Sequence, residues 1–335
     1  MVYATEILNK SFEKTKELLF PIRKDYWLKM AFVSLFIGNS GFNNFGSSNL
    51  NSSDKAKISD AFKGMTFQQI ISKINTSALS FLAQYGLFIG IFIFFLYLIG
   101  LLFSYFNSVF TFVFFDGIVK KEISIKKSIS ETKNQANSFF LFRFIFGILN
   151  FFLLLIIFSP LLIAFFNNKL AEIKIVTLIF VITAFIIYSI IIGLFLFLVN
   201  DFIVPIMFLK KYTFKQAFDY FKKISKNMKF EIFMYWLFKI LLEIAGSFLS
   251  IILFLFSLLL FFVFLLFGFL LYFLLKSNIT LTLIVLLIYG LISFIILFYI
   301  NLILNLPIRL FFEVYKLEMV AKLEEKFEIK SEKTI

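Results

Sequence analysis

The chain alternates between long apolar runs and short polar segments. A helix needs about 20 apolar residues to cross a bilayer, and all the runs except the first reach that length. The first run is shorter, so it must be extended backwards, tilted or re-entrant. The runs cover residues 27–38, 82–115, 138–166, 175–204, 230–275 and 280–306. This pattern predicts an all-α fold, namely a polytopic helical membrane bundle with about six crossings.

Two features of the runs bear on how the helices are arranged. Residues 230–275 are longer than a bilayer accommodates in one straight helix, at about 1.5 Å per residue. This run therefore either begins in the membrane interface or bends near Gly246 and Ser247. The short polar turn 167–174 predicts that the runs before and after it are antiparallel neighbours.

The polar segments divide a predicted single integral membrane domain, residues 1–335, into parts. Residues 1–26 predict an interfacial helix, which Pro21 interrupts. Residues 39–80 predict an extracytoplasmic loop that is rich in Asn, Ser and Gly over 39–53 and forms one short helix over 54–74. The main helical bundle covers 81–312, and a charged, amphipathic cytoplasmic tail covers 313–335.

The predicted interfacial helices share an amphipathic pattern. Thr213 and Gln216 form a T-x-x-Q capping box that opens the helix of the connector 205–229. Apolar residues then recur at helical spacing beneath lysines, so we expect this helix to lie on the membrane. Its apolar face consists of Phe214, Ala217, Phe218, Phe221, Ile224 and Met228, and that of the N-terminal helix consists of Ile7, Leu8, Phe12, Thr15 and Leu19. The connector 116–137 shows the same periodicity.

Lys and Arg residues predict the orientation, because cytoplasmic loops carry an excess of both. Most of them fall in residues 1–30, 116–137, 205–229 and 307–335, and few fall in 167–174 and 273–279. We therefore expect both termini in the cytoplasm of a cell that carries this protein in its plasma membrane. The loop 39–80 holds four lysines, but placing it inside would move both strongly basic connectors outside.

Composition narrows the chemistry. The chain is 61% hydrophobic and 16% charged, against roughly 45–50% and about 25% in soluble domains. The lack of Cys and His excludes thiol nucleophiles, disulfides, Cys/His metal sites and His-based triads. No phosphate-binding loop, dinucleotide turn or serine elbow occurs either. We expect no enzyme activity and no cofactor.

The net charge of +13 is spread over short segments beside the apolar runs. This placement favours anionic membrane lipids over nucleic acid as the partner, because a nucleic-acid-binding protein concentrates its charge in one basic domain. The candidate lipid-contact residues are Lys210, Lys211, Lys222, Lys223 and Lys226.

Ionisable residues inside apolar runs are costly and indicate function by default. Lys239 and Glu243 lie four residues apart, so they share a helix face and can pair. Their pair is either an interfacial ion pair or part of a transport path. Asp116 and Asp201 lie at equivalent ends of two runs, where each carboxylate either bonds a lysine of a neighbouring connector or is solvated.

Similar segments recur at the ends of the runs. FDGIVKKEISIKKSI (115–129) and NDFIVPIMFLKKYTFKQAF (200–218) share an Asp, an Ile-Val pair, a Lys-Lys pair and a Ser/Thr-x-Lys element. A Pro-Ile pair also recurs, so Pro205 and Pro307 are candidate connector positions. Either proline is simply tolerated where a span meets water, or the chain contains parallel hairpin repeats.

The segment FIVPIM (202–207), followed by lysines, Thr213, Ala217 and an amphipathic helix, resembles a known membrane domain. This domain accompanies some glycerophosphodiester phosphodiesterases and has stand-alone, uncharacterised prokaryotic relatives. The opening FPIRKDYWLKMAF (20–32) is similar to such stand-alone proteins. The resemblance covers nearly the full chain. It implies a helical membrane domain without phosphodiesterase activity, since no catalytic domain and no His are present.

The sequence leaves several functions open. The first is an uncharacterised multi-pass membrane protein, non-enzymatic, with a lipid-interacting, organisational or accessory role. The alternative is a transporter or channel-like permeation protein for a small solute. A membrane enzyme that uses carboxylates on a lipid ranks last, because no pair of carboxylates lies in a recognisable catalytic setting.

Overall fold

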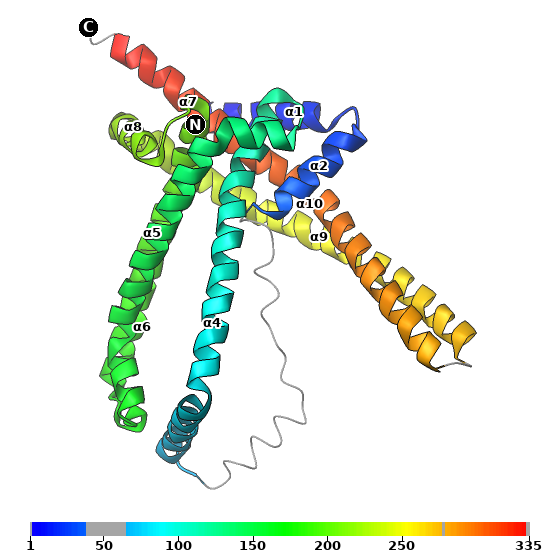
Figure 1. The fold of residues 1–335 in the computed structure, drawn as a ribbon. Helices are drawn as coiled ribbons and strands as arrows, with labels where there is room; N and C mark the ends of the chain where they lie inside the picture. The colour runs from blue at the N-terminus through cyan, green and yellow to red at the C-terminus, as the bar shows by residue number, and fades with distance from the viewer. Residues whose placement is uncertain (1, 38–64, 277–278, 333–335) are drawn as a thin grey trace. The chain divides into compact units, whose positions relative to one another are not determined.

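A computed structural model describes residues 2–37, 65–276 and 279–332. These residues form helices and connecting turns without strands, which confirms the predicted all-α class (Figure 1). The α-helices are α1 (Val2–Leu19), α2 (Lys24–Leu35), α4 (Phe67–Lys120), α5 (Ile125–Phe166), α6 (Ile175–Leu198), α7 (Val204–Lys210), α8 (Phe214–Asn227), α9 (Lys229–Leu275) and α10 (Ile279–Glu332). A short 3-10 helix, η2 (Leu170–Glu172), precedes α6, and a π-helix, η3 (Val199–Ile203), follows it.

Five helices in the described ranges are long and apolar enough to cross a membrane. They are α4, α5, the combined α6 to α7 segment, α9 and α10. The predicted run 27–38 corresponds to α2, whose 12 residues are too short for a crossing. The predicted count of six crossings is therefore not confirmed.

The chain divides into two compact units. Unit 1 comprises Met1–Gly38, Asn107–Ser138 and Asp201–Ile335, and unit 2 comprises Asn39–Phe106 and Phe139–Asn200. The predicted single membrane domain over 1–335 stays a prediction.

In unit 1, α2 runs antiparallel to the last turns of α4. The Asn107 amide donates to the Phe36 carbonyl (2.7 Å), and the Phe36 ring stacks on Phe110 (4.5 Å). At the other end of α2, the Tyr26 hydroxyl donates to the Gly117 carbonyl (3.3 Å). Burial raises the pKa of Tyr26 to about 12, although nearby Arg23 lowers it. The helix α2 therefore accompanies only the end of α4, as expected for a segment that does not span.

The helix α1 packs along the C-terminal part of α10. Glu318, which is buried, accepts ion pairs from Lys10 (2.8 Å) and Lys14 (2.7 Å). The face of α1 that is buried consists of Ile7, Ser11, Thr15, Leu18 and Leu19, whereas Phe12 is 63% exposed. The predicted apolar face is thus wrong at Phe12, because packing on α10 selects the neighbouring stripe.

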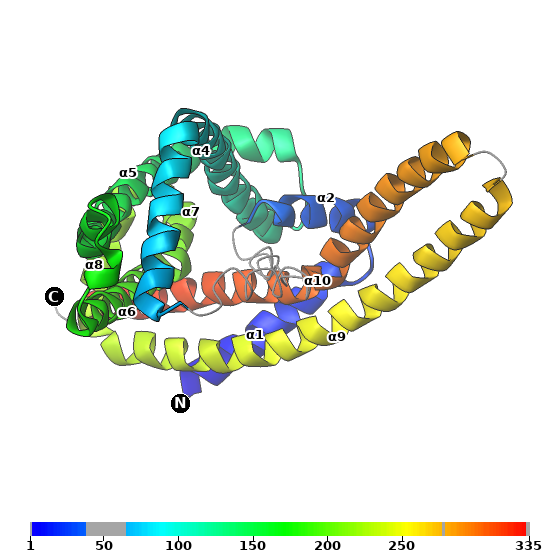
Figure 2. The same cartoon turned by 90° about the horizontal axis from the view of Figure 1, so that it is seen from below.

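The predicted tail 313–335 is not a separate segment. The helix α10 continues through Pro307, so the proline marks no helix end. Val314, Tyr315 and Val320 are buried in unit 1, which gives the segment after Pro307 a packing role. The run 230–275 is likewise one continuous helix, α9, and it forms a hairpin with α10 (Figure 2).

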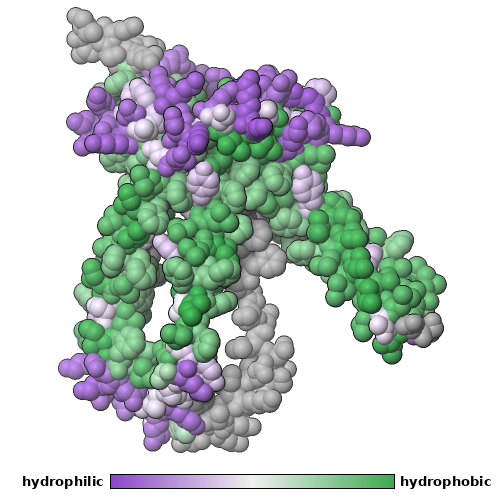
Figure 3. Space-filling model, viewed as in Figure 1, coloured by the Kyte–Doolittle hydropathy of each residue, from purple (hydrophilic) through white to green (hydrophobic). Residues whose placement is uncertain are grey.

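The far part of this hairpin is apolar on its outer faces. Gly268 of α9 lies against the Tyr289 ring of α10, and the Tyr289 hydroxyl donates to the Phe264 carbonyl (2.7 Å). Around this contact most large apolar side chains are exposed. In the most apolar stretch of each of the two helices, at most 6% of the residues are buried. Figure 3 shows the hydrophobic surface of the hairpin and the hydrophilic residues gathered over α1 and α8.

The helix α8 begins at the predicted capping box, in which Thr213 and Gln216 bond reciprocally. Its apolar face does not point outward: Ala217, Phe221 and Ile224 are buried within unit 1. Only Phe218, at 38% exposed, keeps substantial apolar surface outside. The prediction that this apolar face rests on the membrane is therefore wrong for most of its residues, because the face packs against the protein.

In unit 2, α5 and α6 form the predicted antiparallel hairpin. The Tyr188 hydroxyl donates to the Asn150 side chain (2.6 Å), and Phe146 lies 5.2 Å from Phe195 between ring centroids. At the turn, Asn168 adopts a left-handed backbone (φ 57°). Its side-chain oxygen accepts a hydrogen bond from Asn75 of α4 (2.9 Å).

The predicted extracytoplasmic loop 39–80 falls mostly on residues outside the described ranges, and it stays a prediction. The helix α4 already begins at Phe67, so the predicted short helix over 54–74 merges with the following run. The start has a local cause: the Thr66 amide donates to the Gln69 side chain (2.8 Å), and the Gln69 amide donates to the Thr66 hydroxyl (3.4 Å). This is a second capping box of the T-x-x-Q type.

Candidate functional site

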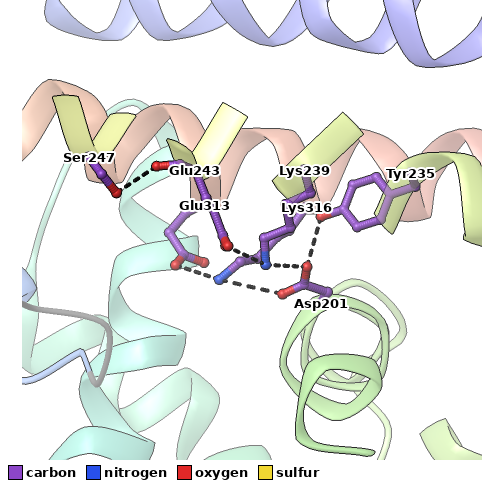
Figure 4. Close-up of polar contacts among 7 residues, drawn as sticks. All are labelled: Asp201, Tyr235, Lys239, Glu243, Ser247, Glu313 and Lys316. Atoms are coloured by element: carbon purple, nitrogen blue, oxygen red, sulfur yellow. Dashed lines mark hydrogen bonds and ion pairs between the residues drawn. The ribbon is translucent and has the colours of Figure 1, made fainter. Parts of the chain in front are cut away.

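A cluster of charged side chains lies buried in unit 1, where η3, α9 and α10 meet (Figure 4). Asp201 is 1% exposed, Lys239 and Lys316 are each 6% exposed, and Glu313 is 7% exposed. Burying a charge is costly unless it is paired and hydrogen-bonded. The contacts of each member therefore show how the cluster is stabilised.

Asp201 is the acceptor on which the other helices converge. The Lys239 ammonium donates to Asp201 Oδ2 at 2.5 Å, and the Tyr235 hydroxyl donates to the same oxygen at 3.1 Å. The Lys316 ammonium lies 4.0 Å from the other carboxylate oxygen, Oδ1. Both oxygens of Asp201 thus face a cation, one from α9 and one from α10.

Each lysine also has a carboxylate on its own helix. Lys239 lies 3.3 Å from Glu243, one turn later on α9, and Lys316 lies 2.7 Å from Glu313, one turn earlier on α10. The predicted pairing of Lys239 with Glu243 is confirmed as a contact. It is the longer of the two ion pairs that Lys239 makes, however, and Glu243 is 48% exposed in its side chain.

The charges of the cluster balance when Arg309 is included. Arg309 lies one turn before Glu313 on α10 and donates to the Ser34 carbonyl of α2 (2.6 Å). Three cations then accompany three carboxylates, Asp201, Glu243 and Glu313. A buried site with balanced charge tolerates its desolvation better than one with an excess of either sign.

The local backbone of Asp201 is unusual. Residues Val199–Ile203 form a π-helix, a rare element that is often found at functional sites. Pro205 follows in the first turn of α7, where a missing N–H costs no helical hydrogen bond. Pro205 thus lies buried at the start of a helix, whereas Pro307 lies in the interior of α10. The two candidate connector positions therefore differ in their place along the helix.

Asp116 occupies a related but smaller site at the end of α4. It is buried, and it accepts from Lys120 (2.9 Å) and from the Ser128 hydroxyl of α5 (2.5 Å). Lys120 also pairs with Glu131 of α5. For both Asp116 and Asp201, the alternative of a solvated carboxylate is therefore wrong, although the partner of Asp201 comes from α9 instead of a connector.

The two predicted repeats share local structure at their Lys-Lys pairs. The second lysine of each pair, Lys121 and Lys211, adopts the left-handed conformation with φ 56°. This conformation ends a helix, as in the αL cap that usually employs glycine. The repeated sequence therefore encodes the same helix end twice, with a buried Asp before each.

The candidate lipid-contact lysines separate into two groups. Lys210 is half-buried and pairs with Glu324 of α10 (3.4 Å). The others are exposed, and within the described part of the chain none of them forms an ion pair: Lys211, Lys222, Lys223 and Lys226. Lys215 of α8, which is not one of the candidate residues, belongs to this exposed group as well.

Glu313 and Lys316 are the members of the cluster that sequence reasoning missed. They fall in FFEVYKLEM (311–319), most of which the sequence pattern predicts to be a charged tail. Their spacing of three residues among large apolar side chains is a signal for a paired, buried face. Nothing in the local pattern, however, indicates that Asp201 is their neighbour.

Comparison with known proteins adds a family but no activity. No curated protein and no solved structure matches the chain. The model of a family of unknown function, DUF7544, matches residues 2–329. Since this match covers almost the entire chain, the protein belongs to the DUF7544 family.

Proposed function

We propose that the protein is a non-enzymatic, multi-pass integral membrane protein that binds anionic lipid headgroups through the lysine face of α8 and thereby serves an organisational or accessory role. The membrane in question is the plasma membrane, with both termini in the cytoplasm. The observation that carries the proposal is that, among the described residues, the α8 lysines are exposed and form no ion pair, on a helix whose apolar face is buried.

The helix geometry concentrates these lysines on one face. At 100° per residue, Lys215, Lys222 and Lys226 fall within about 40° of one another, opposite the buried Ala217 and Ile224. We call these three residues the lysine stripe. Asp219 is the one carboxylate in the sequence of α8, so the stripe keeps a net positive charge.

Elsewhere in unit 1, buried carboxylates are neutralised internally. Glu318 is paired with two lysines of α1, Asp116 with Lys120, and Asp201 with Lys239. The lysine stripe has no such partner within the described residues. A rigid row of uncompensated ammonium groups suits phosphate headgroups, and each lysine contributes on the order of 1 kcal/mol near an anionic leaflet.

Native mass spectrometry of the detergent-solubilised full chain tests the proposal by counting bound phosphatidylglycerol and phosphatidylcholine. We expect a preference for phosphatidylglycerol. The triple variant Lys215→Gln, Lys222→Gln, Lys226→Gln should lower the phosphatidylglycerol affinity by about tenfold or more, given the contribution of each lysine. Higher salt should weaken the binding of the unchanged protein.

A charge-matched variant serves as the control. Lys16, Lys24 and Lys133 are exposed and lie on α1, α2 and α5 of unit 1. Replacing these three with Gln removes the same net charge without touching α8, so phosphatidylglycerol binding should stay near that of the unchanged protein. Equal losses in both variants, or no lipid preference at all, would contradict a specific site on α8.

The second candidate function is a transporter or channel-like permeation protein. The buried charge cluster favours it, because Asp201, Lys239 and Lys316 each belong to a helix that is long and apolar enough to span a membrane. The resemblance to the phosphodiesterase-associated membrane domain stays a separate prediction. It is compatible with a lipid-binding accessory role and with a transporter or channel-like role.

A further inference from the structure

The buried cluster contains two ion pairs that do not depend on Asp201. Lys239 and Glu243 pair within α9, and Glu313 and Lys316 pair within α10. If Asp201 is removed from the cluster, α9 and α10 retain two ammonium groups and two carboxylates. Each lysine of the cluster thus keeps an ion pair on its own helix without the third segment.

Asp201, by contrast, depends entirely on the other helices. Within the described residues, its partners Tyr235, Lys239 and Lys316 all lie on α9 and α10. It also sits in the π-helix, a rare element that occurs mostly as a single turn inside α-helices. Tertiary contacts therefore hold the carboxylate in its place.

Apolar packing holds the residues beside Asp201 in place. The Phe202 ring stacks on Phe221 of α8 (5.2 Å) and meets Tyr235 of α9 edge-on (5.2 Å). Ile203 is 1% exposed and Met207 is fully buried. If residues 199–207 leave the cluster, these side chains become exposed to solvent. Their accessibility therefore measures whether the segment is engaged or released.

We propose that Asp201 is the detachable member of the cluster, so that residues 199–207 exchange between this engaged arrangement and a released one in which α9 and α10 keep their own ion pairs. The charge of Asp201 sets the balance, because only the engaged state pairs that carboxylate with two buried ammonium groups. The contacts that support this exchange do not rest on the lipid binding proposed for α8.

Cysteine accessibility measures the exchange directly, because the chain has no natural Cys. The full chain with Ile203→Cys is treated with a water-soluble maleimide, and Leu310→Cys, also fully buried but on α10, reports global unfolding. We expect Cys at 203 to react faster than Cys at 310. Adding Asp201→Asn should accelerate the reaction at 203 by about tenfold or more, as local opening becomes easier, and leave the reaction at 310 unchanged.

Two further variants sharpen the test. Asp116→Asn makes the same chemical change in the other buried carboxylate that ends a run, and it should not alter the reaction at 203. Glu243→Gln should also leave the reaction at 203 slow, because Lys239 still donates its hydrogen bond to Asp201. Equal rates at 203 and 310 in the unchanged protein, no effect of Asp201→Asn, or acceleration at both positions would overturn the proposal. The last result would show that Asp201 merely holds the fold together.

Discussion

At the scale of single residues, burial decides which ion pairs matter. Asp201 and Asp116 each bond a lysine, but Lys239 is 8% exposed in its side chain and Lys120 is 42% exposed. Water screens the second pair and hardly reaches the first. An exposed pair stabilises a protein by about 1 kcal/mol at most, whereas breaking a buried pair leaves an uncompensated charge.

This difference predicts unequal effects of removing the two lysines. Lys239→Met should lower the free energy of unfolding by about 3–5 kcal/mol, because Asp201 then keeps only the distant Lys316 and Tyr235. Lys120→Met should cost less than this, because Lys120 is partly exposed to water and Asp116 keeps its hydrogen bond from the Ser128 hydroxyl. Thermal denaturation of the detergent-solubilised protein compares the two, and the double change Asp201→Asn with Lys239→Met should recover part of the loss. Similar melting temperatures for both single variants would refute the argument.

At the scale of elements, the α9–α10 hairpin depends on glycines where its helices approach closely. A Cβ atom on Gly246 would meet the Phe312 ring at 3.1 Å, and one on Gly268 would meet the Tyr289 ring at 3.2 Å. Around Gly290 of α10, no atom lies within 4 Å of such a Cβ. Small residues at helix crossings are a general device of membrane helices, because packing, not hydrophobic exclusion, drives their association.

We therefore expect Gly246→Leu to destabilise the protein by about 1–3 kcal/mol through overpacking. The matched change Gly290→Leu, on a lipid-accessible position, should be neutral or mildly stabilising, because glycine lowers helix stability. Size-exclusion chromatography after stepwise heating measures how much folded protein remains in each of the two variants. A Gly290→Leu variant as unstable as Gly246→Leu would indicate that the loss of glycine itself, and not the close approach, is responsible.

At the scale of the whole molecule, both chain ends belong to unit 1. The ion pairs of Lys10 and Lys14 with Glu318 join α1 to the last turns of α10. We therefore expect Lys10, Lys14 and Glu318 to lie on the same side of the membrane that the chain is proposed to span. This contact agrees with the expectation, drawn from the distribution of Lys and Arg, that the two ends share one compartment.

The orientation itself is testable with single cysteines in intact cells. Lys16→Cys on α1 and Lys223→Cys on α8 should resist an impermeant maleimide until the membrane is permeabilised, because basic segments stay cytoplasmic. Lys169→Cys, in the turn between α5 and α6, should react in intact cells. Reaction at 16 without permeabilisation would reverse the orientation, and different behaviour at 16 and 223 would contradict the placement of both in one compartment.

Local pattern alone determined the helical class, the long apolar helices and the capping box at Thr213, because each depends on residues within a few positions of one another. The same chemistry at Thr66 went unnoticed, which placed the start of α4 too late. The local pattern also identified Lys239 and Glu243 as a pair, since four residues separate them on one helix face.

Only the tertiary structure decided which charges meet and which faces are covered. Asp201 finds Lys239 and Lys316 through the packing of η3 on α9 and α10, and periodicity carries no information about such distant partners. For α8, the pattern correctly separated an apolar face from a lysine face, yet the apolar face could equally cover a membrane or a protein. Packing within unit 1 made that choice, and it leaves the lysines as the exposed face.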